Sequence, residues 1–462
     1  MRELPYVSRS LGLTLFVASA ACGSSSSSST PDAGAIVDAS ASDTGGEVDA
    51  SDAASDAPPD VDNGAPSTVY PAPHPALPQL VNPSNNPVLT TPKVYLVFYP
   101  NDPNESSLQT FAQRLPTSTY WATTTSQYGV GAISYARTID LTGETPPMMI
   151  ANTDIQTWVA SEIGSGAFGT PDPEAIYTIV YPMGTTITET NPVSALLPPS
   201  KSCVAFGGYH DNAAVSLGDG GAPTNFAYAV IPTCSGSVQD LTAVISHEWV
   251  EASTDPFLTS SGAFTLTGGP DAAYFSVDGD HAVWALLGGG EAGDLCEPEG
   301  ADAYETPADL GFEVQRTWSN VLAAASHDPC APNLAATPFF DSAPVLPETV
   351  TFSSTLTGTV TSKGVTIPLG QSATIEVDLF SDSDTQGPWT VTASDLLSTY
   401  YGSYGLTSSM SFAWDRTQGV NGEKLHLTIT VTGSSVVANA HAFMITSTQG
   451  ARQTVWPGLV VE

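Results

Sequence analysis

The sequence predicts an α/β or α+β domain over residues 93–335 and an all-β sandwich over residues 345–462. In the first range, short runs of β-branched and aromatic residues alternate with segments whose apolar residues recur at helical spacing. In the second range, apolar and polar residues alternate at a period of two, and turn residues such as Asn421-Gly422 separate the runs. A chain of 462 residues is long enough for both domains.

Residues 1–22 are typical of a lipoprotein-type signal peptide. Arg2 and Arg9 supply positive charge, and the apolar run Leu11–Ala18 is too short to span a bilayer. The small residues before Cys22 are similar to the lipobox of bacterial lipoproteins, in which the cysteine is lipidated. We therefore expect an extracytoplasmic protein that is anchored to the outer membrane or cell surface through Cys22, with plain secretion as the alternative.

Two further segments precede the first predicted domain. Residues 23–66 are rich in Ser, Ala and Asp, contain no Lys or Arg, and have few large apolar side chains. Such a segment cannot bury enough surface to fold, so we expect a disordered acidic linker. Residues 67–92 are rich in Pro and Asn, which favours an extended lead-in rather than a core element.

The charge balance limits the classes of partner. A formal net charge of −36, from 11 basic and 47 acidic residues, excludes a nucleic-acid-binding surface. It also disfavours contact with anionic membranes, so we expect membrane attachment only through the lipid anchor. The same charge is compatible with binding of divalent cations and with simple solubility, and it does not distinguish the two.

The cysteines outside the signal peptide indicate two disulfide bonds. An exported protein folds in an oxidising compartment, and four cysteines remain when Cys22 is set aside. They allow three pairings. We expect Cys203–Cys234 and Cys296–Cys330, because these pairs close the shortest loops.

The first domain is predicted to contain strands and helices in alternation. Each predicted strand is a β-branched and aromatic run that turn residues or proline bound, and each predicted helix has helical apolar spacing. The strands are Lys93–Tyr99, Ala175–Pro182 and Phe226–Pro232, and the helices are Ser106–Leu115, Tyr120–Tyr128 and Ile155–Ile163.

A further helix is predicted between Asp240, a candidate N-cap, and Pro256, which cannot continue a helix. His247 and Glu251 are four residues apart and therefore lie on one helical face. The pattern His-Glu-x-x-Glu differs by one residue from the zincin motif His-Glu-x-x-His, whose first and last residues bind Zn²⁺. We therefore consider His247 and Glu251 metal ligands and Glu248 a general base. The alternative is a hydrogen-bonded polar cluster on a half-buried helix.

A zinc site of this kind needs another ligand from a later segment. Glu291 and Asp294 follow a run of glycines that lets the backbone approach the helix closely, and either residue is a candidate. The alternative for both is a surface acidic loop. His281 is a rival ligand, although an exposed loop histidine is the simpler interpretation.

Two other residues have a structural and a functional interpretation. His210 lies in the Gly-containing segment Ser202–Asn212, beside a cysteine, and is either a satisfied polar loop residue or a contact to substrate or metal. Trp318, in a segment predicted to form a closing strand or turn and a short helix, is expected in the core rather than in contact with a ligand.

The C-terminal domain is predicted to be an immunoglobulin-like β-sandwich of seven or so strands. It carries no constellation of His, Cys or carboxylates, so we expect an accessory module in which His426 faces solvent. The predicted strands include Val350–Phe352, Gly358–Val360, Gly364–Pro368, Ala373–Phe380, Trp389–Thr392, Met410–Trp414 and Lys424–Val431.

The segment His247–Pro256, followed by Glu291–Cys296, resembles the phosphate-induced, exordium-like family of exported proteins and its bacterial relatives. The resemblance covers roughly residues 90–335 and includes neither the linker nor the sandwich. It implies the fold of this range and a metal site at these motifs more than it implies a reaction. Plant members of the family are tied to growth at the cell wall.

These observations lead to two functional hypotheses. The first is a surface-anchored, zinc-dependent hydrolase, similar to a metallopeptidase, that acts on a peptide or cell-wall-associated substrate. The second is a non-catalytic cell-surface or cell-wall interaction protein whose acidic site is structural or binds Ca²⁺. A histidine with two carboxylates is a harder ligand set than two histidines with one carboxylate, which makes Ca²⁺ a competitor of Zn²⁺.

Overall fold

The computed structural model describes most of the chain, and the statements below concern the described residues. The expected signal peptide with Cys22, and the linker up to residue 61, lie outside them. The described ranges are 62–189, 200–216, 222–258, 271–287, 290–334, 337–354, 358–401, 407–435 and 439–462.

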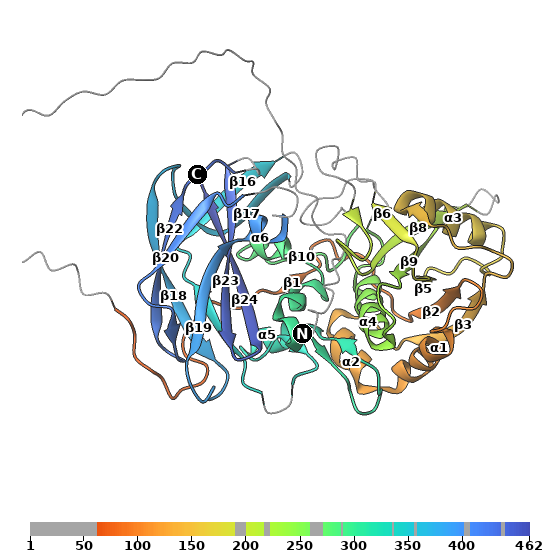
Figure 1. The fold of residues 1–462 in the computed structure, drawn as a ribbon, viewed down its shortest axis with the longest axis horizontal. Helices are drawn as coiled ribbons and strands as arrows, with labels where there is room; N and C mark the ends of the chain where they lie inside the picture. The colour runs from red at the N-terminus through yellow and green to blue at the C-terminus, as the bar shows by residue number, and fades with distance from the viewer. Residues whose placement is uncertain are drawn as a thin grey trace, which may run out of the picture.

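A five-stranded, mainly parallel sheet forms the centre of the N-terminal region (Figure 1). Its first four strands run parallel to one another, and the fifth pairs antiparallel with the fourth at one edge. The N-terminal region is therefore of mixed α/β type, as predicted. In spatial order the strands are β3 (Ser134–Asp140), β2 (Lys93–Phe98), β5 (Ala175–Tyr181), β9 (Thr224–Pro232) and β8 (Tyr209–Val215).

Helices cover both faces of this sheet. Alternate residues of each strand point to opposite faces, and apolar residues on both faces pack against the helices. Leu96 and Phe98 of β2 share one apolar core with α1, α2 and α4, whereas Val97 shares the other core with α3. Strands buried on both faces explain the continuous apolar runs in the sequence. The helices are α1 (Glu105–Arg114), α2 (Thr119–Thr125), α3 (Asn152–Gly164) and α4 (Val238–Thr254), with 3₁₀ turns η1 (Leu115–Thr117) and η2 (Ser126–Tyr128).

Helix α4 begins earlier than expected. Its N-cap is Ser237, whose hydroxyl accepts a hydrogen bond from the backbone N–H of Asp240 at 3.3 Å. The prediction that Asp240 caps the helix is therefore wrong, and Asp240 lies in the first turn, where its carboxylate accepts a hydrogen bond from Ser235. The helix ends at Thr254, just before Pro256, as expected.

The lead-in, residues 67–92, is extended but contributes to the core, which the sequence analysis did not anticipate. Leu77, Leu80 and Leu89 are buried with the helices of the α/β region. The prolines prevent regular pairing over most of the segment, but β1 (Leu80–Val81) still pairs with β10 (Ser276–Val277).

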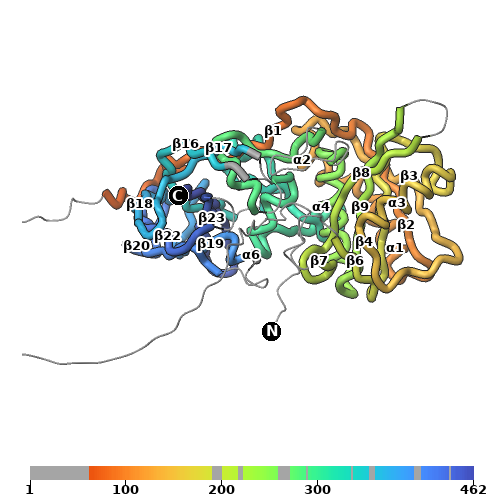
Figure 2. Tube along the Cα trace, turned by 90° about the horizontal axis from the view of Figure 1, so that it is seen from above, coloured from red at the N-terminus to blue at the C-terminus, as the bar shows by residue number. Residues whose placement is uncertain are grey.

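Residues 271–334 form small elements that lie between the α/β region and the C-terminal sheets (Figure 2). The Cys203–Cys234 and Cys296–Cys330 disulfides both form, as expected, and Trp318 is buried against Trp284. The elements are η4 (Ala282–Leu286), η5 (Asp294–Ala303), β11 (Tyr304–Glu305), β12 (Val314–Gln315), β13 (Thr317–Trp318), α5 (Asn320–Ala324) and β14 (Cys330–Ala331). A separate three-stranded sheet contains β4 (Met149–Ala151), β6 (Thr186–Glu189) and β7 (Ser200–Lys201).

The C-terminal region consists of a four-stranded and a six-stranded sheet with an apolar core of their inward-facing side chains. All pairs are antiparallel except β17 with β24. The first sheet contains β15 (Phe340–Pro344), β18 (Ser372–Ser381), β22 (Lys424–Val431) and β20 (Met410–Trp414). The second contains β16 (Glu348–Ser354), β17 (Gly358–Thr366), β24 (Arg452–Val461), β23 (Ala440–Gln449), β19 (Trp389–Asp395) and β21 (Gln418–Gly419), and α6 (Leu396–Tyr401) follows β19.

The last two strands, β23 and β24, were not predicted. Residues 440–445 are buried without interruption, so the strand lacks the alternation on which the prediction depended. His426, on the alternating strand β22, is half-buried and lies within 3.0 Å of the carboxylate of Asp415.

The compartment follows from the disulfides. Two disulfide bonds indicate an extracytoplasmic protein, because reducing conditions in the cytosol disfavour them. Within the described residues, no helix is both long enough and apolar enough to cross a membrane.

Candidate metal centre

Helix α4 is fixed against the sheet by its aromatic and aliphatic side chains. Trp249 stacks on Phe111, and its indole N–H donates a hydrogen bond to the hydroxyl of Thr178 at 2.7 Å. Because these contacts fix the rotation of the helix, His247 and Glu251 lie on the side away from Trp249, and Glu248 lies about a quarter turn from Trp249. All three side chains are 0% exposed.

His247, Glu251 and Asp294 form the first group that can hold a metal ion. The Nε2 atom of His247 lies 2.9 Å from Oε2 of Glu251 and 3.8 Å from Oδ1 of Asp294. Four tetrahedral ligands about 2.0–2.1 Å from Zn²⁺ are separated from one another by about 3.3 Å. The two distances bracket this value, so the ligand atoms lie close enough together to hold a metal ion.

The backbone of the 293–294 turn orients Glu251. Its Oε1 atom accepts hydrogen bonds from the N–H groups of Gly293 and Asp294 at 3.1 and 3.2 Å. Oε2 is directed toward Nε2 of His247 and lies 2.9 Å from it. The carboxylate is therefore held through one oxygen while the other is available to a cation.

Gly293 allows this close approach. A Cβ atom at this position would lie 2.5 Å from Nδ1 of His247 and 2.7 Å from Oε1 of Glu251. Gln315 fixes the same turn, because its amide donates a hydrogen bond to the carbonyl of Gly293 at 2.8 Å. Its own backbone N–H is bonded to the hydroxyl of Ser246 on α4.

His210 belongs to strand β8 rather than to a loop, which corrects the sequence-based expectation. The strand forms by pairing with β9, with His210 opposite Ala229, and this places the imidazole on the face that α4 covers. His210 is 2% exposed, and its Nδ1 atom lies 3.7 Å from the carboxylates of both Glu248 and Glu251.

His210, Glu251 and Glu291 form a second group that can hold a metal ion. Nε2 of His210 lies 3.4 Å from Oε1 of Glu291 and 3.2 Å from the carbonyl oxygen of Asp255, to which it donates its proton. In the neutral imidazole this leaves Nδ1, which faces Glu248 and Glu251, as the nitrogen without a proton. The contribution of Asp255 was missed, since its only sequence signal is its place directly after the helix.

Gly208 brings β8 close to α4. A Cβ atom there would lie 2.6 Å from a methyl group of Val244 and 2.8 Å from Oε1 of Glu248. The glycines beside His210 are evident in the sequence, but no local pattern connects them with the helix.

Burial and the neighbouring charges shift the pKa values of the cluster residues in opposite directions. Burial lowers the pKa of His247 and of His210, but the adjacent carboxylates, above all Glu251 for His247 and Glu248 for His210, raise both pKa values above the ordinary one. Burial raises the pKa of Glu248, and burial together with Glu251 raises the pKa of Glu291 far above its ordinary value. Burial also acts on Glu251, but the positive charge of His247 leaves its pKa lowered.

In the described part of the chain, no lysine or arginine forms an ion pair with the central carboxylates Glu248, Glu251 and Glu291. Both oxygens of Glu248 and Oε1 of Glu291 accept no hydrogen bond from the described part of the chain. Buried carboxylates without partners are costly, so the cluster calls for protons or a cation.

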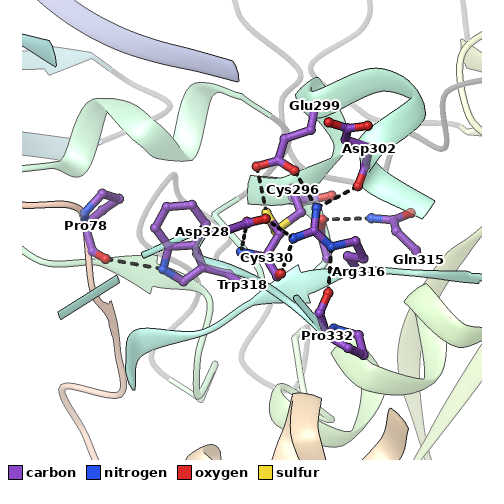
Figure 3. The surroundings of a disulfide bond; sticks show 12 residues. Pro78, Cys296, Glu299, Asp302, Gln315, Arg316, Trp318, Asp328, Cys330 and Pro332 are labelled. Carbon is purple, nitrogen blue, oxygen red and sulfur yellow. Dashed lines mark hydrogen bonds and ion pairs between the residues drawn. A yellow bond between two sulfur atoms is a disulfide. The ribbon is translucent and has the colours of Figure 1, made fainter. Parts of the chain in front are cut away.

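Two other arrangements are not metal sites. His281 belongs to neither group in the described residues, because its ring is bonded to Asp278 at 2.8 Å. Glu299, Asp328 and Cys330 also lie close together, but Cys330 is bridged to Cys296, and the guanidinium of Arg316 lies between the two carboxylates (Figure 3). This third cluster is therefore a buried ion pair network beside a disulfide.

Neither a scan against protein-family models nor a search of curated proteins finds a match for this chain.

Proposed function

We propose that this protein is an extracytoplasmic, zinc-dependent hydrolase of peptide or amide bonds, anchored at the cell surface through lipidated Cys22. The buried group of His247, Glu251 and Asp294, with Glu248 next to it on the same helix, carries the proposal. A bound Zn²⁺ supplies Lewis acidity and lowers the pKa of water.

The nitrogen ligands support Zn²⁺ as the metal. Ca²⁺ takes oxygen ligands almost exclusively, whereas imidazole suits Zn²⁺ and other transition metals. The cluster presents two buried imidazoles, those of His247 and His210, so it is less oxygen-rich than the motif on α4 alone implies.

Glu248 is proposed as the general base. It neighbours the metal ligand His247 in sequence, its oxygens accept no hydrogen bond in the described part of the chain, and burial raises its pKa. A carboxylate with a raised pKa takes a proton from an attacking water more readily than an ordinary one. Nδ1 of His210 lies 3.7 Å from Oε2 of Glu248, so the charge of the imidazole changes the proton affinity of this carboxylate.

The proposal also assigns a domain type to the α/β region and to the C-terminal region. We infer a zincin-like, exordium-like α/β domain over residues 93–335, which the position of the His-Glu-x-x-Glu helix against a mainly parallel sheet supports. We assign the two-sheet C-terminal region to an immunoglobulin-like accessory module. A peptide or a cell-wall-associated polymer is the proposed substrate class.

A second candidate rests on the burial of the cluster. The side chains of the two groups are no more than 2% exposed, which suits a structural ion better than an ion that must meet a substrate. In this case the protein is a non-catalytic cell-surface or cell-wall interaction protein, and its acidic site holds Ca²⁺.

Metal analysis of the purified protein tests both candidates. We expect bound Zn²⁺ that is lost in Glu251→Ala and retained in His281→Gln, a control histidine outside the cluster. Glu248→Gln should keep the metal and lose hydrolysis of a peptide library. Stoichiometric Ca²⁺ without Zn²⁺ would favour the second candidate, and the absence of any metal after Zn²⁺ titration would refute the hydrolase.

A further inference from the structure

We propose that the cluster holds two divalent cations that share the carboxylate of Glu251. The first lies between His247 and Asp294 on one side, and the second lies between His210 and Glu291 on the other. This inference rests on the proposed function for its first cation, and the second cation is the new element.

The geometry provides two sets of ligands around one shared residue. Each set contains one histidine nitrogen, one further carboxylate oxygen and Glu251, and the ligand atoms within each set lie within 4.8 Å of one another. Oε2 of Glu251 lies 2.9 Å from Nε2 of His247 and 3.7 Å from Nδ1 of His210. A carboxylate between two such sets is the bridging ligand of a two-metal site, in which the ions are about 3.5–4 Å apart.

The histidine of the second set has the orientation of a metal ligand. Its Nε2 proton is directed to the carbonyl oxygen of Asp255 at 3.2 Å, which leaves the Nδ1 lone pair toward the carboxylates. Metal-bound histidines are commonly oriented by such a bond from the other ring nitrogen. A cation or a second imidazole proton is needed there, because the Nδ1 lone pair of neutral His210 and the oxygens of Glu248 and Glu251 would repel one another.

The carboxylate side of the second set also lacks a protein partner. Oε1 of Glu291 is buried and accepts no hydrogen bond from the described part of the chain, although the side chain is only 1% exposed. Nε2 of His210, which is bonded to the carbonyl of Asp255, lies 3.4 Å from this oxygen. An oxygen held in this position without a donor is a ligand atom directed at a cation.

The charge of the cluster favours two cations over one. Glu248, Glu251, Glu291 and Asp294 bring four carboxylates together, and none of the ion pairs in the described chain brings an arginine or lysine to the first three. Asp255 and Glu297 are further buried carboxylates beside these four, so a single divalent cation leaves more negative charge unbalanced than two cations do. The second cation would also position a water for attack and stabilise the leaving oxygen or nitrogen.

Metal stoichiometry of the whole protein provides the test. The protein is loaded with Zn²⁺, freed of excess ion by gel filtration and analysed by mass spectrometry, beside Glu291→Gln, Asp294→Asn and the control His281→Gln. We expect two equivalents in the wild type and the control, and one in each cluster variant. Mn²⁺-loaded protein should give the paramagnetic resonance spectrum of a coupled pair, a readout that does not depend on how the variants fold.

The outcomes separate this inference from the proposed function. One equivalent in the wild type, lost in Asp294→Asn and retained in Glu291→Gln, would overturn the second cation and leave the zinc hydrolase intact. Two equivalents that both persist in Glu291→Gln, or two uncoupled Mn²⁺ ions, would place the second ion elsewhere and also overturn it. No bound metal at all would overturn both.

Discussion

Gly293→Ala should impair metal binding through a steric effect alone. The backbone of Gly293 has φ −75° and ψ −44°, which alanine adopts without strain, so the only new interaction is the added methyl group. That methyl carbon would lie 2.5 Å from Nδ1 of His247, about 0.9 Å short of the 3.4 Å at which ordinary contact begins. It would also lie 2.7 Å from Oε1 of Glu251.

The loss of stability in Gly293→Ala depends on how far the helix and the turn can move apart. His247 and Glu251 lie on a buried helix, and the amide of Gln315 holds the turn, so neither side relaxes freely. Overpacking of a buried site costs about 1–3 kcal/mol in the free energy of unfolding. Displacement of two ligands should weaken Zn²⁺ binding by about 10–100-fold, the effect of losing a residue that orients a ligand.

The assay is a competition titration of Zn²⁺ against a chromophoric chelator, with urea denaturation of the same samples. The matched control is Gly236→Ala, just before α4, where a Cβ atom would meet nothing within 4 Å. This control should bind Zn²⁺ as the wild type does. If Gly293→Ala and Gly236→Ala had equal Zn²⁺ affinity and stability, the turn would not be the ligand-positioning element described here.

Three further predictions concern other parts of the cluster and fold. Arg316→Met should lower the free energy of unfolding by about 3–5 kcal/mol in urea denaturation, since it leaves Glu299 and Asp328 buried without their cation, and an unchanged midpoint would contradict this. Burial raises the pKa of Asp341 to about 7, so the folded state keeps a proton that the unfolded state releases near pH 4. Stability should therefore fall as the pH rises from about 4 to about 7, by about 4 kcal/mol from this residue, and Asp341→Asn should remove that part of the pH dependence in thermal denaturation. Zn²⁺ binding at pH 7 should release protons, because the carboxylates hold the pKa of His247 above its ordinary value in the metal-free protein, and calorimetry in buffers of different ionisation enthalpy would reveal no release if this is wrong.

The elements that could be predicted have a local signal. The strands β2, β5 and β9 are buried on both faces and read as continuous apolar runs, and α4 has helical apolar spacing with Pro256 beyond its end. Strand β8 has no such signal, because its segment Tyr209–Val215 mixes His, Asp and Asn with small residues. It is a strand because β9 offers it an edge for pairing.

The candidate site was predictable only in part for the same reason. The motif on α4 is local, since positions 247 and 251 share a face on any helix. The choice between Glu291 and Asp294 is not local, because it depends on how the turn at Gly293 meets the helix. The structure places these two residues in different ligand groups that share Glu251.

The role of His210 depends on three segments that are distant in sequence. The sheet edge sets the direction of its side chain, Gly208 lets the strand approach Glu248, and the end of α4 supplies the carbonyl of Asp255. None of these three segments has a sequence pattern that indicates a metal site by itself. Together they bury an imidazole among carboxylates, at a cost that only a bound cation or a proton offsets. Folding of the α/β region and occupancy of this cluster should therefore be thermodynamically linked. A cation or proton that enters the cluster stabilises the folded state and does not stabilise the unfolded state.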